Sequence, residues 1–283
     1  MSKKTILLQI HKDLVAGQLK LPTLPEVSLR IKKVAADPDA DIPALSKVAE
    51  IDPAFCGYLL QISNSPIYRG TVDINNVNLA IGRLGLQNTC NIAMTYAVRA
   101  LFCANRKRMA KRLEKVWKNS TYTAAVASVI AEHTKSVFDP DEAVLAGLLQ
   151  DIGCLPLIDK AANYPELIED DRAMLFLFDR YAATLGVAIL KKWGLDDKFV
   201  NVVRNRDNWK YNEIDEVNLT DLVLLAKLHT YLGQKLLKPI PRINLVPSFV
   251  KLQVEATLSP TQSLQFVEDA KQKIAQTRSA FGG

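Results

Sequence analysis

The chain has few of the residues that mark a disulfide-stabilised or membrane-inserted protein. Its four cysteines, Cys56, Cys90, Cys103 and Cys154, show no Cys-x-x-Cys spacing, and each lies in an apolar stretch. We interpret them as buried, reduced hydrophobic residues. No apolar run reaches about 18 residues, so no transmembrane helix is expected. Polar and charged residues interrupt the N-terminal apolar stretch too early for a signal peptide. The sequence therefore predicts a cytoplasmic protein.

Sequence motifs of catalytic sites and of phosphate-binding loops are also missing. The chain has no Gly-x-Ser-x-Gly elbow, no glycine-rich phosphate loop and no His-Glu-x-x-His. Its three histidines, His11, His133 and His229, are dispersed, and we interpret each as a surface or helix-capping residue. The acidic residues within 166–171 are interpreted as capping and solubilising groups. Cys154 has no histidine nearby in the sequence that could activate it as a nucleophile.

Acidic residues are fewer than basic ones, which gives the chain a net charge of +6. Much of the excess comes from Arg106, Lys107, Arg108, Lys111, Arg112, Lys115 and Lys118. At about 100° per residue on a helix, these side chains spread over most of the circumference instead of forming one stripe. We therefore interpret the segment as a solvated linking helix, and nucleic acid is not the expected partner.

Helix signals recur along the whole chain, and no convincing strict alternation indicates strands. Asp41, Asp52 and Asp139 are expected helix caps. The expected helices span 5–15, 27–36, 42–50, 53–62, 76–84, 87–104, 113–132, 140–151, 178–193, 197–206, 220–237 and 260–279. The predicted fold class is all-α.

Two groups of residues carry a family resemblance. Residues 147–153 read Gly-Leu-Leu-Gln-Asp-Ile-Gly, the signature of the HD superfamily of metal-dependent phosphohydrolases with Gln150 in place of histidine. Around it lie, in order, Leu-Pro-Thr-Leu-Pro (21–25), Asp-Pro (52–53), Asn-Ser (64–65), Ala-Ile-Gly-Arg-Leu-Gly (80–85) and Trp-Gly-Leu (193–195). This series resembles the HDOD domain, a regulatory relative of the HD hydrolases in bacterial signalling proteins. The resemblance implies an N-terminal helical subdomain at 1–105, packed on a degenerate HD-like helical subdomain at 106–283.

The resemblance also places the former metal ligands of the HD enzymes. The aspartate of the His-Asp pair is retained as Asp151. The other ligand positions correspond to Asn119, Gln150, Ala182, Asn205 and Lys227. A carboxylate among such side chains cannot hold a catalytic dication tightly. We therefore expect no metal, no cofactor and no catalytic residue.

The sequence thus predicts a non-enzymatic signal-transduction domain that binds a protein partner, or a small ligand in the vacated pocket. Two alternatives stay open: a diverged metal-dependent phosphohydrolase, and a nucleotide- or nucleic-acid-binding regulator. A buried carboxylate without its metal needs a partner. We hypothesise that Lys227 donates a charge-assisted hydrogen bond to Asp151, with Asn119 or Gln150 as further polar partners.

Overall fold

The protein is helical throughout the part of the chain that the structure describes. This computed structural model describes residues 3–103, 107–134, 138–232, 234, 236–252, 258–260 and 263–282. Within these ranges there is no β-strand, although Leu258 and Leu264 form an isolated antiparallel bridge. The all-α prediction is therefore confirmed.

Six helices lie within residues 3–103. They are α1 (Lys3–Val15), α2 (Glu26–Ala35), α3 (Ile42–Ala49), α4 (Pro53–Ser63), α5 (Val77–Leu84) and α6 (Leu86–Phe102). The predicted cap Asp41 accepts a hydrogen bond from the amide of Ala44 at 2.8 Å, and Asp52 does the same for Ala54 at 2.9 Å. Ala104, the expected end of the sixth helix, lies outside the described residues.

The later helices build the larger part of the molecule. They are α7 (Ala110–His133), α8 (Pro140–Leu149), α9 (Cys154–Ala161), α10 (Pro165–Ile168), α11 (Asp171–Leu177), the π-helical turn η1 (Phe178–Ala182), α12 (Ala183–Lys192), α13 (Asp197–Arg204), α14 (Leu219–Tyr231), the 3-10 turn η2 (Ile243–Leu245), α15 (Pro247–Lys251), α16 (Gln265–Asp269) and α17 (Lys271–Ala280). The predicted cap Asp139 accepts a hydrogen bond from the amide of Asp141 at 2.9 Å.

Two expected helix ends were wrong, and both errors bear on the site. The helix expected over 220–237 stops at Tyr231, because Leu232 adopts a ψ of 133° that leaves the helical region. The helix expected over 197–206 stops at Arg204, because Asn205 leaves the helix with φ −100° and ψ 18°. Arg206 is thereby released from the helix surface.

The last helix also starts later than expected. Leu264 pairs with Leu258 in the isolated bridge, and α16 begins only at Gln265. Ser259 therefore caps no helix of the expected span, and Thr261 and Gln262 of the expected capping box lie outside the described residues. The bridge at Leu258 and Leu264 lies where the sequence predicted the start of the helix.

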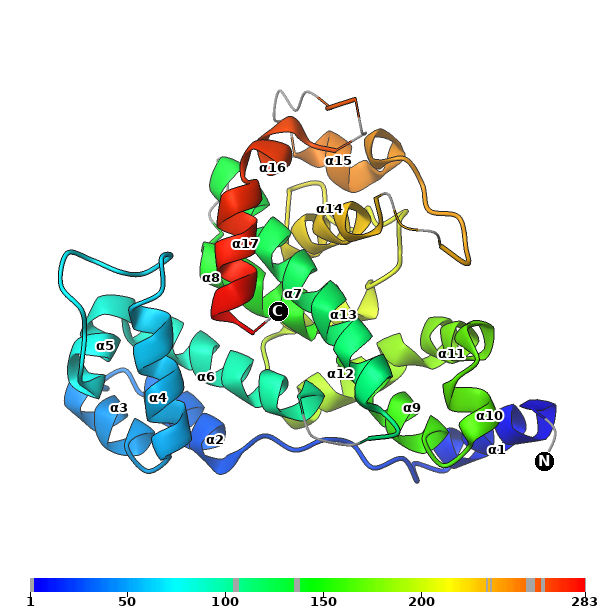
Figure 1. The fold of residues 1–283 in the computed structure, drawn as a ribbon, viewed down its shortest axis with the longest axis horizontal. Helices are drawn as coiled ribbons and strands as arrows, with labels where there is room; N and C mark the ends of the chain where they lie inside the picture. The colour runs from blue at the N-terminus through cyan, green and yellow to red at the C-terminus, as the bar shows by residue number, and fades with distance from the viewer. Residues whose placement is uncertain are drawn as a thin grey trace.

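The helices form two groups joined by α6 (Figure 1). Helices α2–α5 lie at one end, and α6 runs from them toward the group built around α7, where it packs on α8. Helix α1 lies apart from α2, at the other end of the molecule near α10. Its Asp13 forms an ion pair with Lys160 of α9 at 2.5 Å. The boundary expected at 105/106 falls among residues outside the described ranges, and the two-subdomain division stays a prediction.

Two glycines allow the helices that carry the site to approach closely. A Cβ added to Gly147 of α8 would lie 2.5 Å from the Cα of Ala124 in α7, and one added to Gly153 would lie 1.9 Å from the carbonyl oxygen of Ala182. Both distances are far shorter than van der Waals contact. The two glycines thus fix the Gln150-Asp151 turn between α7 and the helix of residues 171–192.

The helix of residues 171–192 combines α11, η1 and α12. By length and composition it could cross a membrane, contrary to the sequence-based expectation, although its most apolar window is 44% buried within the fold. Because the core helix of a soluble protein meets the same criterion, the observation is weak evidence for a membrane span. Gly194 ends the helix with a φ of +63°, as expected for a glycine cap.

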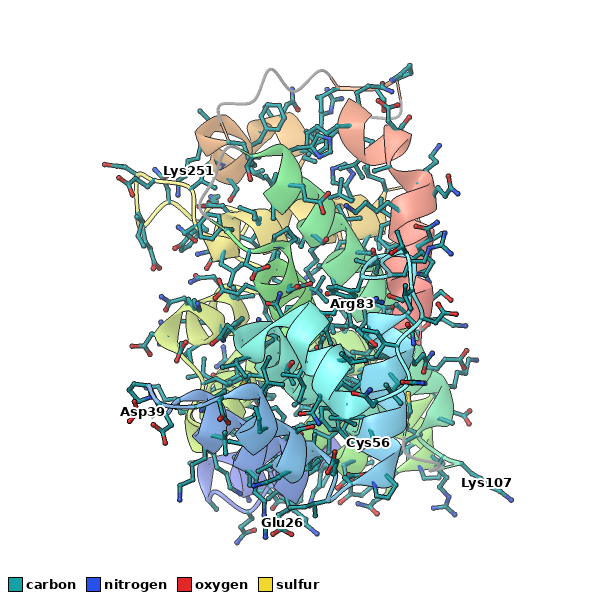
Figure 2. The ribbon with its side chains drawn as sticks, turned by 90° about the vertical axis from the view of Figure 1, so that its left-hand side faces the viewer. Glu26, Asp39, Cys56, Arg83, Lys107 and Lys251 are labelled. Carbon is teal, nitrogen blue, oxygen red and sulfur yellow. The ribbon has the colours of Figure 1, made fainter. Side chains whose placement is uncertain are left out.

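The basic segment is not one solvated helix. Arg106 lies outside the described residues, Lys107 and Arg108 lie in a turn before α7, and Lys107 extends away from the fold (Figure 2). Arg112 is half-buried and donates to the carbonyl of Ile168 at 2.7 Å. Lys118 pairs with Glu114 on the helix surface at 2.6 Å. Some of these basic side chains therefore form contacts within the protein.

Candidate functional site

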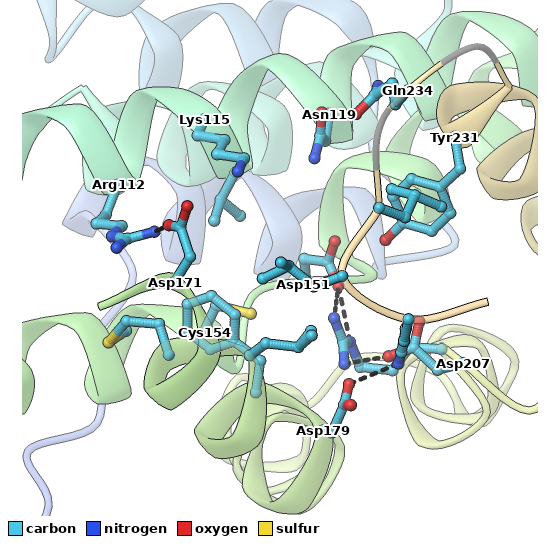
Figure 3. Close-up of a pocket in the computed structure, with 18 of the residues that line it drawn as sticks. Arg112, Lys115, Asn119, Asp151, Cys154, Asp171, Asp179, Asp207, Tyr231 and Gln234 are labelled. Atoms are coloured by element: carbon cyan, nitrogen blue, oxygen red, sulfur yellow. Dashed lines mark hydrogen bonds and ion pairs between the residues drawn. The ribbon is translucent and has the colours of Figure 1, made fainter. Parts of the chain in front are cut away.

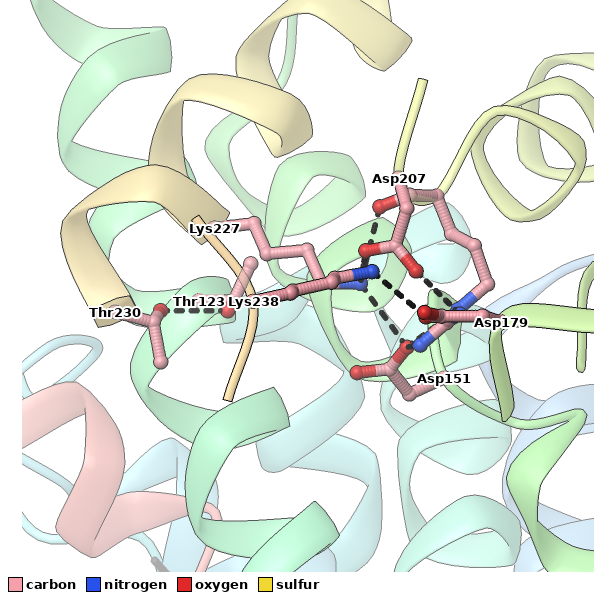
Figure 4. A network of polar contacts seen from close by, with 8 residues as sticks. Thr123, Asp151, Asp179, Asp207, Lys227, Thr230 and Lys238 are labelled. Carbon is pink, nitrogen blue, oxygen red and sulfur yellow. Dashed lines mark hydrogen bonds and ion pairs between the residues drawn. The ribbon is translucent and has the colours of Figure 1, made fainter. Parts of the chain in front are cut away.

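Asp151 follows α8 in a tight turn and meets a buried lysine from α14. Its Oδ1 accepts a hydrogen bond from Lys227 Nζ at 3.1 Å (Figure 4). The Lys227 side chain is 1% exposed and that of Asp151 is 8% exposed. This contact confirms the hypothesised pairing between Asp151 and Lys227.

Asp151 and Lys227 also contact a second pair of charged residues, Arg206 and Asp207. Arg206 Nε donates to Asp151 Oδ1 at 2.7 Å, and a terminal nitrogen of the same guanidinium contacts the same oxygen. Arg206 also pairs with Asp207 Oδ2 at 2.5 Å, while Lys227 lies 3.0 Å from Asp207 Oδ1 and donates to the carbonyl of Arg206 at 3.0 Å. Two cations and two carboxylates thus form a closed, charge-balanced cluster.

Electrostatics within this cluster favour the charged forms. Burial would raise the pKa of Asp151, but the charges of Arg206 and Lys227 hold that pKa below its ordinary value. Burial and Arg206 act to lower the pKa of Lys227, yet Asp151 and Asp207 outweigh them and raise it. All four groups are therefore ionised at neutral pH.

The prediction that Asn119 or Gln150 would complete the cluster was wrong. Gln150 is fully buried, and neither its side-chain oxygen nor its nitrogen has a hydrogen-bond partner among the described residues. Asn119 lies on α7 and lines a cavity beside Asp151. Arg206, expected as the last residue of the helix over 197–206, was not predicted as a partner of Asp151. The signal was the Arg-Asp pair at 206–207 next to an expected ligand position.

The two remaining predicted positions do not join the cluster. Ala182 is buried at the end of η1, and its carbonyl lies against Gly153. Asn205 is buried, but its amide donates to the carbonyl of Asn201 at 3.2 Å and its side-chain oxygen accepts from Asn208 at 3.0 Å. Both residues support the local backbone.

A cavity of about 310 Å³ opens beside the cluster (Figure 3). It is lined by side chains of α7, α11, η1 and the segment after α14, together with Asp151, Cys154, Arg206 and Asp207. Its volume is at the lower end of that of small-molecule sites in proteins. The site predicted from the resemblance therefore adjoins a real cavity.

Other residues that the sequence offered as candidates for catalysis have structural roles. Burial raises the pKa of the Cys154 thiol to about 12, which opposes a nucleophilic role. Cys103 is exposed and Cys56 is half-buried, so the expectation of four buried cysteines holds for Cys90 and Cys154 alone. Each cysteine is a free thiol. Among the acidic residues of 166–171, Asp170 caps α11 by accepting from the amide of Arg172 at 2.9 Å.

None of the three histidines contacts the cluster among the described residues, and not all of them lie on the surface. His11 accepts or donates a hydrogen bond with the hydroxyl of Tyr181 at 3.0 Å, and His133 is the exposed last residue of α7. His229 is buried, contrary to expectation, and burial lowers its pKa to about 4.

The side chains at this site do not suit a divalent metal. Among the described residues no three His, Cys, Asp or Glu side chains gather as a ligand set. Asp151 Oδ1 is engaged by the Lys227 ammonium and the Arg206 guanidinium. A dication at this place would meet two fixed positive charges, which repel it.

The comparisons with known proteins agree with the motif series. The HDOD domain profile matches residues 21–209. The chain belongs to the HDOD domain family. The match includes the early Leu-Pro-Thr-Leu-Pro segment, Asp151 and the Arg206-Asp207 pair, and it ends before α14.

Solved structures show the same fold over nearly the whole chain. A Shewanella amazonensis SB2B protein, provisionally assigned as a metal-dependent phosphohydrolase, has 24% sequence identity and a TM-score of 0.80, with 99% of each chain covered. An HDOD domain protein of unknown function from Geobacter sulfurreducens has 22% identity and a TM-score of 0.71, covering 97% of this chain and 96% of that one. A third, provisionally assigned as a signal transduction protein, comes from Marinobacter aquaeolei VT8, with 18% identity and a TM-score of 0.62 over 99% of this chain and 66% of that one.

A curated relative extends beyond this chain. It is an uncharacterized protein from Treponema pallidum (strain Nichols), 24% identical over 268 residues. The alignment covers 89% of this chain, which spans about half the length of that relative.

Proposed function

We propose that this HDOD protein is a non-enzymatic signal-transduction domain that acts by binding. The observation that carries the proposal is the pairing of two cations, Lys227 and Arg206, with Asp151, the residue that the resemblance implies to be a former metal ligand. Metal-activated water requires an electrophilic ion with open coordination positions. A lysine ammonium has no coordination position for water, and it engages the carboxylate that would otherwise ligate such an ion.

The proposal places the protein in the cytoplasm and gives it either a protein partner or a small ligand in the cavity beside Asp151. A cavity lies beside Asp151 within the helical scaffold, at the place where the resemblance implies a lost ligand set. A scaffold kept in this form is suited to recognition. The signalling assignment of the Marinobacter aquaeolei protein with the same fold supports this reading at the level of the fold.

Metal content gives the first test. The purified protein is analysed for Fe, Mn and Zn after exchange into metal-free buffer, next to the Asp151→Ala variant. We expect neither protein to contain a stoichiometric transition metal. About one metal ion per chain in the unaltered protein, lost in Asp151→Ala, would exclude the proposal and favour a diverged hydrolase.

Hydrolysis gives the second test. Phosphomonoester and cyclic-nucleotide turnover should stay at background with added Mn²⁺, Fe²⁺ or Zn²⁺. The matched comparison is Lys227→Asp combined with Gln150→His, which returns two ligand types to the site. Turnover by the unaltered protein that EDTA abolishes and a divalent metal restores would show that the cluster tolerates catalysis.

A further inference from the structure

The cavity beside Asp151 has an apolar side and a charged side. Its apolar wall comes from α7, from the α11–η1 helix and from the segment after α14. The residues that form it are Val116, Met174, Leu175, Phe178, Leu236, Leu237 and Ile240. Leu237 is 56% exposed although it lines the cavity, which places it at the mouth. A ligand with an apolar body would cover this surface and gain the free energy of its removal from water.

The carboxylates that line the cavity are all neutralised by neighbours. Asp171 pairs with Arg112, Asp179 with Lys238 at 2.7 Å, and the other two carboxylates belong to the cluster of Lys227 and Arg206. With Lys227 included, five cations face four carboxylates among the described residues of this region. The excess positive charge is the side chain of Lys115, which no described carboxylate pairs within ion-pair distance.

Lys115 lies one helical turn before Asn119 on α7, so both side chains emerge on the same face. Figure 3 shows both extending from the helix toward the cavity. Neither side chain has a hydrogen bond to another described residue. The charge of Lys115 also contributes to the lowered pKa of Asp171, after the hydrogen bond that Arg112 donates to it. An ammonium and an amide at this spacing can together donate to the oxygens of one anionic group.

We propose that this cavity binds an amphipathic anion, with its anionic group on Lys115 and Asn119 and its apolar body against α11, Phe178 and Leu236. The proposal rests on the proposed function, since it names the ligand class of the same vacated pocket. The excess positive charge would attract an anionic group on the ligand. A carboxylate and a phosphate ester share this chemistry, and the experiment separates the two.

Isothermal titration calorimetry with decanoate, decyl phosphate and decanol tests the ligand class. We expect the two anions to bind and decanol, which has the same chain without the charge, to bind roughly tenfold more weakly, as expected for one charge-assisted contact. A tighter decanoate than decyl phosphate would identify a carboxylate ligand, and the reverse order a phosphate ester. Equal affinity for decanoate and decanol overturns the proposal.

Matched variants place the binding within the cavity. Lys115→Met should weaken anion binding roughly tenfold and leave decanol unchanged. Lys118→Met, one turn along the same helix and outside the cavity lining, should change neither. Leu175→Trp should fill the cavity and abolish binding of all three ligands, whereas Phe176→Trp, on the neighbouring 53% exposed residue, should not. Thermal unfolding verifies that each variant is folded.

Failure of this proposal is distinct from failure of the proposed function. Decanoate binding that Leu175→Trp leaves intact, or that Lys115→Met and Lys118→Met change equally, would show that the anion binds elsewhere. The protein would then still be metal-free and inactive in the tests above. Metal-dependent turnover in the same preparations would instead reject the non-enzymatic function, whatever the cavity binds.

Discussion

Lys227 Nζ lies 3.1 Å from Asp151 Oδ1, and this contact joins α14 to the turn after α8 in the interior of the protein. Removing two charges from water costs several kcal/mol for each ion. Arg206 and Asp207 offset this cost because Arg206 also contacts Asp151 and Asp207 also contacts Lys227, and the cluster of four stays neutral. The stability of the site therefore depends on the complete set of four charges.

Replacing Lys227 with methionine should destabilise the protein by about 3–5 kcal/mol, because it leaves an unbalanced buried carboxylate. Urea unfolding at pH 7 measures the change. The variant Lys227→Met combined with Asp207→Asn restores neutrality and should lose less than the single variant. Lys118→Met is the control on an exposed ion pair and should stay within about 0.5 kcal/mol. A loss below about 1 kcal/mol for Lys227→Met would contradict the ion-pair account.

Replacing Gln150 with leucine should stabilise the protein. Both polar atoms of its side chain are buried and have no partner among the described residues, and such groups cost about 1–3 kcal/mol each in desolvation. We expect Gln150→Leu, which has a similar volume, to raise the free energy of unfolding by about 1–2 kcal/mol. Chemical denaturation measures it. Destabilisation by Gln150→Leu would indicate that an ordered water or ligand satisfies the amide. The variant Gln150→Glu buries a charge and should be strongly destabilised in either case.

The sequence was sufficient to predict the fold class and one contact of the site, the pairing of Lys227 with Asp151. Caps such as Asp41 and Asp52 are local, because their side chains bond amides two or three residues away. The pairing of Lys227 with Asp151 could be predicted because a buried carboxylate needs a cation and the resemblance placed both residues around one former metal. Neither argument required knowledge of distant packing.

The rest of the site depends on where helices end against their neighbours. The apolar spacing of Leu236 and Leu237 suggested that α14 continues, whereas the chain leaves the helix at Leu232 and these leucines line the cavity. Arg206 looked like the last residue of a helix, and its role follows from the irregular backbone at Asn205. Tertiary contacts decide such ends, because helix propensities differ by less than about 1 kcal/mol per residue.

The pairing of Tyr68 with Asp141 should make stability depend on pH. The Tyr68 hydroxyl donates to the Asp141 carboxylate, but burial raises the pKa of Asp141 to about 6 from an ordinary 3.8, with Asp139 and Glu132 adding to the rise. A carboxyl whose folded pKa is raised contributes stability that is full below pH 3.8 and is lost as the pH rises through 6. Asp141→Asn keeps an acceptor for Tyr68 and should remove this loss.

Urea unfolding between pH 4 and pH 7.5 measures the effect of Asp141→Asn. The variant should gain stability over the unaltered protein as the pH rises, and the difference should level off above about pH 7. Tyr68→Phe removes the hydrogen bond to the ionised carboxylate, so it should steepen the loss instead. A difference between Asp141→Asn and the unaltered protein that does not vary with pH would show that Asp141 titrates normally.

Gly153 should tolerate no side chain. A Cβ at this position would lie 1.9 Å from the carbonyl oxygen of Ala182 and 2.7 Å from the amide nitrogen of Gly186, both backbone atoms that move only if the η1–α12 helix shifts. We expect Gly153→Ala to destabilise the protein by about 2–3 kcal/mol or more, at the upper end of overpacking effects. Gly57→Ala is the matched control, because nothing lies within 4 Å of its added Cβ in α4, and it should stabilise the protein by up to about 1 kcal/mol. Thermal and urea unfolding of the two variants measure the difference. If the helices at Gly153 were loosely packed, Gly153→Ala would change the stability as little as Gly57→Ala does.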